Sequence, residues 1–188
     1  MTTTKIAIPL PALPITGSVA DLGALDQDAE QDLALFKILI VDDSRFYRTV
    51  IINALAPFRL TNVVEAIDGA DALEALRTCE FHMVLMDYEM PGMNGAEVVR
   101  QIRWSEDEKI DAKVPIIMIS DFAEKAIILA ARNAGIHEFV CKPVVPSELY
   151  KRIRSTLENP REFIVSDEYR GPDRRWMERE EAPEGATG

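Results

Sequence analysis

Four short apolar segments of this 188-residue chain each run directly into polar residues whose side chains could do chemistry together. In chain order, these residues are Asp42 and Asp43, Asp87, Ser120 with Asp121, and Lys142. Carboxylates gathered at one place repel one another unless a cation joins them. Hard oxygen ligands suit Mg²⁺, which takes one or two carboxylates directly and keeps several waters. The set therefore predicts a magnesium site.

A hydroxyl and an ammonium beside that magnesium site would make it complementary to a phosphoryl group. Asp87 could attack phosphorus while the metal bridges one phosphoryl oxygen. Ser120 and Lys142 would then bind the other oxygens. An Asp-Asp pair alone is more often a solvated turn, but the complete set at four segment ends favours phosphoryl chemistry over that reading.

The apolar segments that carry these residues have the composition of strands in a buried parallel sheet. A continuous rather than alternating apolar run is what a sheet covered on both faces requires. With one weaker segment, we expect five strands, at residues 37–41, 63–66, 83–86, 114–119 and 138–141. Segments of helical period separate them, and we expect helices at residues 44–56, 69–79, 95–104, 122–133 and 147–157.

Alternation of strand and helix predicts a doubly wound α/β fold with right-handed crossovers. Ser44 is a predicted N-cap, and Gly135 stands where a helix would end in the left-handed conformation. Ligands of such folds bind at the carboxyl ends of the strands, near the switch in strand order. The polar residues described above lie at that edge.

Composition excludes several classes of protein. Apolar residues make up 47% and charged residues 28% of the chain, as in ordinary globular proteins. The formal charge of −11 disfavours nucleic acid and anionic membranes as partners. Two cysteines fit a reducing compartment, and no apolar stretch reaches the ~20 residues that span a bilayer. We therefore expect a cytoplasmic protein that does not insert into membranes.

The motifs at the strand ends resemble those of the receiver domain of two-component response regulators. The matching segments are residues 37–44, 83–95, 116–120 and 139–143. The resemblance covers residues 37–158 and implies a flavodoxin-like receiver fold, a five-stranded parallel sheet in the order 2-1-3-4-5. Residues 1–36 and 159–188 would then be N- and C-terminal extensions of a single receiver domain.

The resemblance also implies a role for each polar residue. Asp87 would be the phosphoryl acceptor, and Asp42 and Asp43 would hold Mg²⁺ with it. The backbone carbonyl of Glu89 would be a further metal ligand, and Lys142 would pair with the phosphoryl group. Two more roles concern a conformational switch, in which Ser120 is the moving hydroxyl and Phe139 is the aromatic residue that turns inward. Lys142 would precede a cis proline, Pro143.

Asp121 departs from the family pattern, in which the residue after the switch hydroxyl is usually small. One interpretation is that Asp121 turns to solvent or caps the helix expected from Phe122. The alternative is that its charge repels incoming phosphodonors or alters hydrolysis of the phosphoryl group. The sequence leaves both open.

A partner surface is predicted on the helix expected at residues 122–133. Its periodicity assigns Ala123, Ile127, Ala130 and Ala131 to the core, which leaves Ile128 and Leu129 pointing outward beside Arg132. We expect those three outward residues to contact a partner or a second copy of the chain. Alternatively, one of the chain's own extensions covers them.

The two extensions are acidic and carry weaker patterns. Residues 18–36 have helical spacing, which predicts an amphipathic helix docked on the domain, with disorder as the alternative. Residues 159–188 are expected to be partly disordered. Within them, the arginines of residues 169–176 could bind a carboxylate or phosphate group of a partner, or could simply be solvated.

Three classes of function compete on this sequence. The favoured one is a phosphoryl-accepting regulator of a two-component or phosphorelay system, with no DNA-binding output domain and only self-phosphorylation and autodephosphorylation as chemistry. Its partners would be a histidine kinase or histidine phosphotransfer protein, a downstream protein effector and a possible second copy of itself. The alternative is a receiver-fold binding or dimerisation module that never carries phosphate. An aspartyl phosphatase is disfavoured, because its nucleophile follows the first strand in an Asp-x-Asp motif.

Overall fold

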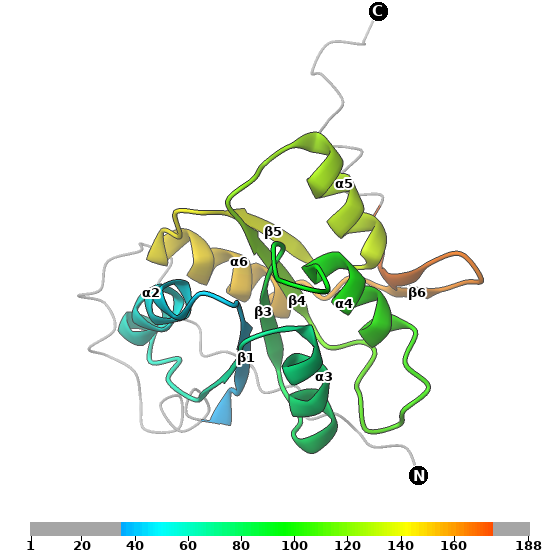
Figure 1. The fold of residues 1–188 in the computed structure, drawn as a ribbon, viewed down its shortest axis with the longest axis horizontal. Helices are drawn as coiled ribbons and strands as arrows, with labels where there is room; N and C mark the ends of the chain where they lie inside the picture. The colour runs from blue at the N-terminus through cyan, green and yellow to red at the C-terminus, as the bar shows by residue number, and fades with distance from the viewer. Residues whose placement is uncertain (1–34, 175–188) are drawn as a thin grey trace, which may run out of the picture.

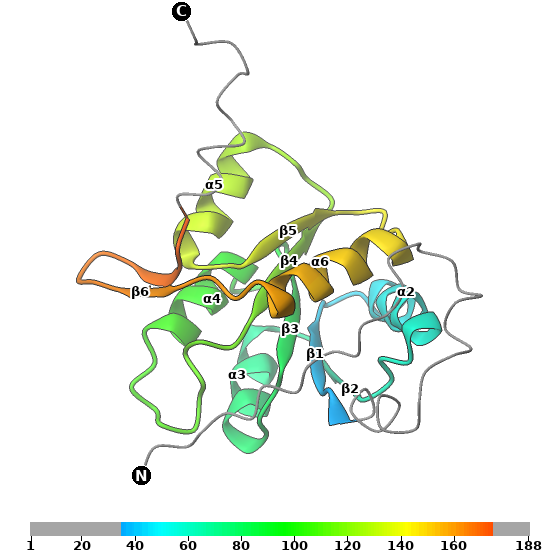
Figure 2. The same ribbon diagram turned by 180° about the vertical axis from the view of Figure 1, so that it is seen from behind.

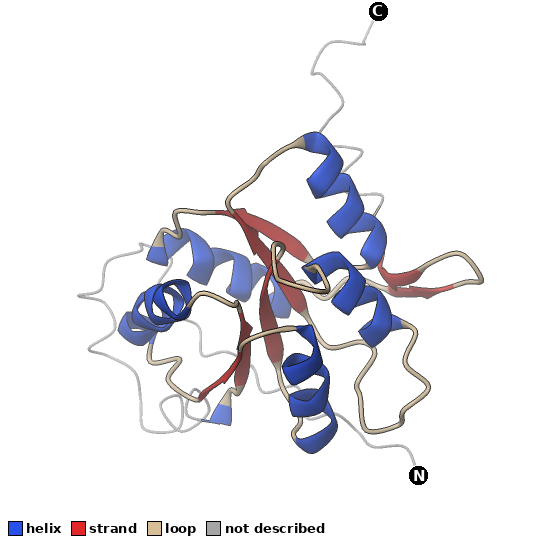
Figure 3. Ribbon diagram, viewed as in Figure 1, coloured by secondary structure: helices blue, strands red, loops and turns tan. Residues whose placement is uncertain are grey.

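A computed structural model describes residues 35–174 of the chain. Its centre is a five-stranded parallel sheet in the order β2-β1-β3-β4-β5, as predicted. The strands are β1 (Ile38–Val41), β2 (Val63–Ala66), β3 (Met83–Asp87), β4 (Ile116–Ser120) and β5 (Glu138–Cys141). Because all five strands run the same way, their carboxyl ends meet at one edge of the sheet (Figure 3).

Helices cover both faces of the sheet (Figures 1 and 2). They are α2 (Arg45–Leu55), the short 3₁₀ helix η2 (Ala56–Phe58), α3 (Gly69–Thr78), α4 (Gly95–Arg103), α5 (Lys125–Ala134) and α6 (Pro146–Glu158). Helices α3, α4 and α5 share one buried apolar cluster with the sheet, whereas α2, η2 and α6 share the other. The doubly wound α/β architecture is therefore confirmed.

The central strands bury both of their faces, which explains their continuous apolar sequences. Every residue of β1, β3 and β4 is buried. Along β1, Leu39 packs in the cluster under α3 and α4, while Ile38 and Ile40 pack in the cluster under α2 and α6. The edge strands β2 and β5 are only partly buried. This partial burial explains why the sequence of β2 has the weakest apolar pattern of the five strands.

Local signals set several of the helix ends. The Ser44 side chain accepts from the backbone N–H of Tyr47 and caps α2, as predicted. Gly135 ends α5 with φ of 105°, in the left-handed region that glycine adopts without steric cost. Asn94 and Glu97 form a capping box at the start of α4, next to the site described below.

Helix α5 begins at Lys125, three residues later than predicted. The backbone N–H of Phe122 donates to the Ser120 hydroxyl at 3.1 Å, and residues 121–124 form an exposed loop. Ala123 is consequently exposed rather than in the core, so that prediction is wrong. Figure 1 shows why α5 buries little of its surface: its N-terminal end projects beyond the sheet.

The predicted division of α5 into buried and outward residues is also too sharp. Ala131 is buried as expected, but Ile127 and Ala130 are only half-buried. The proposed partner residues are half-buried too; they are Ile128, Leu129 and Arg132. These residues lie on α5, away from the polar residues at the strand ends, and do not line the pocket there.

A small antiparallel hairpin follows α6, made of β6 (Phe163–Val165) and β7 (Arg170–Pro172). It packs at the ends of α4 and α5 (Figure 2). Beneath it lies the fully buried Arg103, whose guanidinium donates to backbone carbonyls of Gly135 (2.9 Å), Ala112 (2.7 Å) and Val114 (2.9 Å). The Phe163 ring covers that guanidinium. The first part of the C-terminal extension is thus packed against the domain.

The arginines of the C-terminal motif make contacts within the chain. Arg170 stacks on Trp104, with its guanidinium carbon 4.3 Å from the ring centroid. Arg174 lies over Tyr169 and donates to the Asn133 side chain at 2.7 Å. Arg170 and Arg174 are therefore not simply solvated; the rest of the predicted motif, residues 175 and 176, lies outside the described residues.

Phe36, the residue that precedes the predicted domain, packs with residues of the sheet in one of the buried clusters. Phe36 is buried and stacks on His82, with ring centroids 5.1 Å apart. The predicted helix at residues 18–36 otherwise lies outside the described residues. Among residues 35–174, no helix has the length and apolar character needed to cross a membrane.

Candidate functional site

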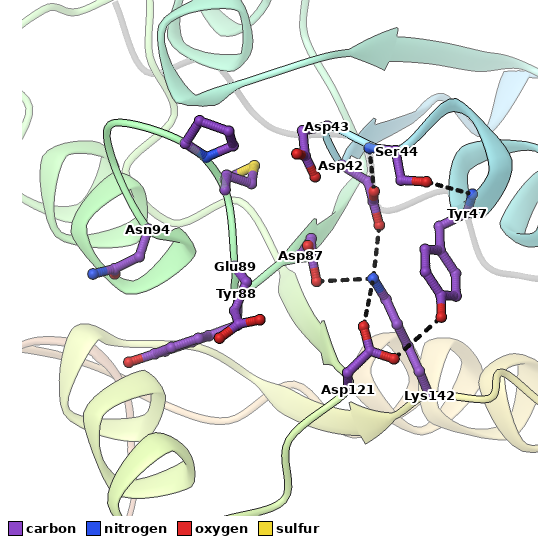
Figure 4. A pocket seen from close by; sticks show the side chains of 12 residues that line it. Asp42, Asp43, Ser44, Tyr47, Asp87, Tyr88, Glu89, Asn94, Asp121 and Lys142 are labelled. Atoms are coloured by element: carbon purple, nitrogen blue, oxygen red, sulfur yellow. Dashed lines mark hydrogen bonds and ion pairs between the residues drawn. The ribbon is translucent and has the colours of Figure 1, made fainter.

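A pocket of about 560 Å³ opens at the carboxyl ends of β1, β3 and β4 (Figure 4). It contains most of the residues singled out from the sequence: Asp42, Asp43, Asp87, Glu89, Asp121 and Lys142. Asp42 and Asp87 are buried at its base, while Asp43 is exposed at its rim. The convergence expected from parallel strand ends is therefore present.

Lys142 lies at the centre of the pocket. Its ammonium Nζ is 3.0 Å from a carboxylate oxygen of Asp42, 3.0 Å from one of Asp87 and 3.6 Å from one of Asp121. The Lys142 side chain is only 3% exposed, and its peptide bond to Pro143 is cis, as predicted. One buried cation thus holds carboxylates from three different strand ends.

The pKa values of Asp87 and Lys142 follow from their burial and from the charges beside them. Burial raises the pKa of Asp87 to about 6, against the opposing effect of the Lys142 ammonium. Burial alone would lower the pKa of Lys142, but its hydrogen bonds to Asp42 and Asp87 raise that pKa above its usual value. Lys142 therefore carries its charge at neutral pH, and the ionised form of Asp87 is less favourable than in water.

Three carboxylates of the pocket fit a hard divalent cation. Asp42, Asp43 and Asp87 each offer one oxygen, and these oxygens lie within 4.8 Å of one another. Lys142 neutralises only part of their charge, so a further cation would be stabilised there. Oxygen ligands of this kind are those that Mg²⁺ prefers. Glu89 also lines the pocket, and the role of its backbone carbonyl stays a prediction.

Arg48 of α2 holds the acidic loop in place, and sequence reasoning missed it. Its guanidinium donates to the backbone carbonyls of Asp42 at 2.8 Å and Asp43 at 3.4 Å, and to the Glu65 side chain at 2.7 Å. Arg48 is itself buried. The one signal for it was a charged residue on the inward face of an amphipathic helix.

Gly95 allows α4 to begin directly against the phosphoryl-acceptor candidate. A Cβ at this position would lie 2.2 Å from the carbonyl oxygen of Asp87 and 2.9 Å from the sulfur of Met118. The Gly95 N–H instead donates to the carbonyl of Tyr88 at 2.8 Å. Only glycine permits this close approach of backbone to backbone.

The two predicted switch residues lie close to the pocket without lining it. Ser120 is fully buried at the end of β4, and its hydroxyl accepts the Phe122 N–H. Phe139 is half-buried on the neighbouring strand β5 and packs against the cluster under α3, α4 and α5. Ser120 pairs with Cys141, two residues beyond Phe139, so the two switch candidates lie on adjacent strands.

Asp121 lines the pocket although its side chain is 47% exposed, and it does not cap a helix, because α5 begins only at Lys125. Tyr47 donates its hydroxyl to one Asp121 oxygen at 3.2 Å, and Lys142 lies near the other. The Tyr47 ring lies beside the same ammonium, 3.8 Å from centroid to Nζ. The hydrogen bond and charge of Asp121 raise the pKa of Tyr47 above its usual value. Sequence reasoning did not single out Tyr47.

Comparisons with known proteins agree with this geometry. The family model of the response regulator receiver domain matches residues 38–154. The chemotaxis protein CheY of Pseudomonas aeruginosa is 36% identical over 122 residues, which make up 65% of this chain and 96% of that protein.

Solved receiver domains share the fold. A CheY-like response regulator receiver domain protein from Methanospirillum hungatei has a TM-score of 0.58 at 27% identity, covering 66% of this chain and 94% of that one. The receiver domain of sensor histidine kinase PA1611 from Pseudomonas aeruginosa, with a magnesium ion coordinated in its active-site cleft, has a TM-score of 0.58 at 26% identity, covering 65% and 98%. The family match, the fold and the pocket lead to one conclusion: this chain belongs to the response regulator receiver domain family of two-component signalling.

Proposed function

We propose that this protein accepts a phosphoryl group on Asp87 in a Mg²⁺-dependent reaction, and that the acyl phosphate switches a protein-binding surface. The observation that carries the proposal is the contact of Lys142 with both Asp87 and Asp42, beside the three-carboxylate group. The intact set also favours this function over a receiver-fold module that never carries phosphate.

Each residue of the pocket has a place in that reaction. A carboxylate oxygen of Asp87 attacks phosphorus, the new O–P bond forms, and the bond from phosphorus to the donor breaks with its electrons leaving on the donor. Lys142 balances charge on the phosphoryl oxygens. Bound Mg²⁺ would neutralise a further phosphoryl oxygen and so ease approach to the carboxylates. Water later attacks the acyl phosphate, inorganic phosphate leaves, and the free carboxylate of Asp87 is restored.

The donor is proposed to be a phosphohistidine of a histidine kinase or a histidine phosphotransfer protein. Asp87 is only 6% exposed, but the pocket that reaches it is open to solvent along the loops after β1, β3 and β4. The acidic balance of the chain, −11, supports signalling through protein contacts rather than through DNA. The chemistry is confined to self-phosphorylation and autodephosphorylation, with no external substrate turned over.

The switch is proposed to run from Ser120 to α5. Phosphorylation places about two negative charges where Asp87 carried one, and the Ser120 hydroxyl would leave the Phe122 N–H to donate to a phosphoryl oxygen. That movement opens space for Phe139 on the adjacent strand. The surface of α5 around Ile128, Leu129 and Arg132 would then change its fit to a protein effector or to a second copy of the chain.

Phosphodonor treatment of Asp87→Asn tests the function. Intact-mass spectrometry should detect one added phosphoryl group on the parent with acetyl phosphate and Mg²⁺, and none with excess chelator. Asp87→Asn should take up none, whereas Glu80→Gln, which removes an exposed carboxylate outside the pocket, should match the parent. Equal uptake by Asp87→Asn would refute the assignment.

A further inference from the structure

Asp121 is, with Glu89, one of two carboxylates that line the pocket in addition to the three that group into a cation site. The oxygens that lie within 4.8 Å of one another belong to Asp42, Asp43 and Asp87, and Asp121 is outside that group. Its only cationic contact among the described residues is Lys142, at 3.6 Å. A metal ion bound by the other three carboxylates would therefore leave the charge of Asp121 facing the place where phosphate must arrive.

Tyr47 fixes that charge in position. The Tyr47 hydroxyl donates to an Asp121 oxygen at 3.2 Å. Tyr47 belongs to α2 and lies on the other side of Lys142 from Asp87 (Figure 4). The Asp121 side chain is 47% exposed, so this hydrogen bond, together with the Lys142 contact, keeps it from turning toward water. The Tyr47 ring also lies against Lys142, which places all three side chains in one contact group.

Lys142 is consequently shared between two kinds of anion. The proposed phosphoryl group on Asp87 must draw on the same ammonium that Asp121 now contacts at 3.6 Å and Asp87 at 3.0 Å. Asp121 weakens that attraction in two ways, by occupying the Lys142 charge and by repelling the incoming anion directly. The penalty rises with the negative charge on the donor.

We propose that Asp121, held by Tyr47, is a specificity-determining residue that discriminates among phosphodonors by their charge. It slows phosphoryl transfer from small dianionic donors more than from monoanionic ones. The proposal rests on phosphorylation of Asp87 and names a control of that reaction. Tyr47 is a positioning residue that acts through Asp121.

The size of the effect follows from Coulomb's law. Two unit charges about 6 Å apart in a water-like medium alter a rate by roughly threefold, and a dianion facing one carboxylate by roughly tenfold. Removing the Asp121 charge should therefore accelerate phosphorylation by acetyl phosphate, which is a dianion at neutral pH, by roughly tenfold. The rate of phosphorylation by phosphoramidate, a monoanion, should rise only about threefold. Both gains should shrink at high salt, because the residue lies at the pocket mouth.

The test measures initial rates of phosphorylation with both donors at saturating Mg²⁺ in four variants. Asp121→Asn removes the charge and keeps the shape and an oxygen for Tyr47. Tyr47→Phe removes the hydroxyl and keeps the ring beside Lys142. The double variant shows whether Tyr47 acts through Asp121. Glu124→Gln is the matched control: Glu124 is an exposed residue of the same loop, and its side chain makes no capping hydrogen bond to α5.

The expected result has three parts. Asp121→Asn gains more with acetyl phosphate than with phosphoramidate, Tyr47→Phe gains less in the same direction, and the double variant matches Asp121→Asn. Glu124→Gln behaves as the parent. Equal gains with both donors, or a change confined to the decay of the acyl phosphate, would overturn the role in donor discrimination. If the parent is phosphorylated and Asp121→Asn is identical to it, only this inference fails; if no variant is phosphorylated by either donor, the proposed function fails with it.

Discussion

Arg48 and Asp42 are joined through the backbone: the guanidinium of Arg48 donates to the carbonyl oxygen of Asp42 at 2.8 Å. The same guanidinium reaches the next carbonyl, that of Asp43, and the Glu65 carboxylate on β2. The position of the acidic loop at the end of β1 thus depends on a side chain from the following helix. Ionic pairing of Lys142 with the Asp42 side chain fixes the same loop from the other side.

Arg48→Met should loosen that loop. It leaves two carbonyls and one carboxylate without their donor, which should cost about 2–3 kcal/mol of the free energy of unfolding. Mg²⁺ affinity should fall as well, because Asp42 and Asp43 lose their fixed spacing. Urea unfolding and calorimetric Mg²⁺ titration measure both quantities. Arg45→Met, which removes an exposed arginine from the start of the same helix, is the control; an equal loss in that variant would contradict the role of Arg48.

Gly95→Ala should disturb the loop that follows Asp87. The added methyl group would fall 2.2 Å from the Asp87 carbonyl, so β3 and α4 must separate, at a cost of about 1–3 kcal/mol. Gly92→Ala provides the comparison, since Gly92 has φ of 81° but no atom near its missing Cβ. In that variant the free energy of unfolding should fall only by the roughly 1–2 kcal/mol that a left-handed alanine costs, and the Mg²⁺ affinity should stay unchanged. Unchanged Mg²⁺ binding in Gly95→Ala would argue against the proposed constraint on Asp87.

Asp87 should make the fold less stable as pH rises, when no divalent cation is present. Its pKa is about 6 in the folded protein and 3.8 as a free side chain, so the folded state binds the proton more tightly between those values. Stability contributed by the neutral form is therefore lost as pH rises from about 4 to 6. In chelator, Asp87→Asn should be more stable than the parent above pH 6, by roughly 1–3 kcal/mol, and about equal below pH 4.

Denaturant unfolding of both proteins across pH 4 to 7.5 checks that difference, with Glu80→Gln as the control outside the pocket. Saturating Mg²⁺ should reverse the difference, because the ion binds the ionised carboxylate of the parent. A stability difference that did not change between pH 4 and 7 would be inconsistent with the burial effect on Asp87.

Gly171→Ala should open the C-terminal hairpin. The added Cβ would lie 2.6 Å from the Tyr169 hydroxyl and 2.7 Å from the Cα of Gly135, two clashes that β7 could relieve only by moving away from them. Tyr169 would lose its hydrogen bond to the Pro172 carbonyl, and the cover over Arg103 would loosen. Hydrogen exchange at residues 163–172 should accelerate at least tenfold. Glu168→Ala, in the exposed turn of the same hairpin, should leave exchange unchanged, and identical exchange in both variants would show that the hairpin does not depend on this contact.

The sequence was sufficient to predict the sheet and the convergence of polar residues from four strand ends. Buried parallel strands need continuous apolar runs, and the carboxyl ends of such strands meet at one edge, which brings Asp42, Asp87 and Lys142 together. What it could not predict depends on contacts between segments far apart in the chain. Arg103 donates to the carbonyl of Gly135, 32 residues away, and Tyr47 donates to Asp121 across 74 residues.

The start of α5 was missed for a similar reason. Apolar periodicity extends back to Phe122, but the Ser120 side chain captures the Phe122 N–H and holds the next residues in a loop. A side-chain hydrogen bond of this kind competes with the first helical turn and leaves no trace in the hydrophobic pattern.

The most direct test of the central claim is the site of phosphorylation. The parent protein, treated with a small phosphodonor and Mg²⁺, should gain one phosphoryl group, and reduction of the acyl phosphate with borohydride followed by peptide mass spectrometry should convert Asp87 alone. Modification of any other residue, or equal phosphorylation of Asp87→Asn, would contradict the account.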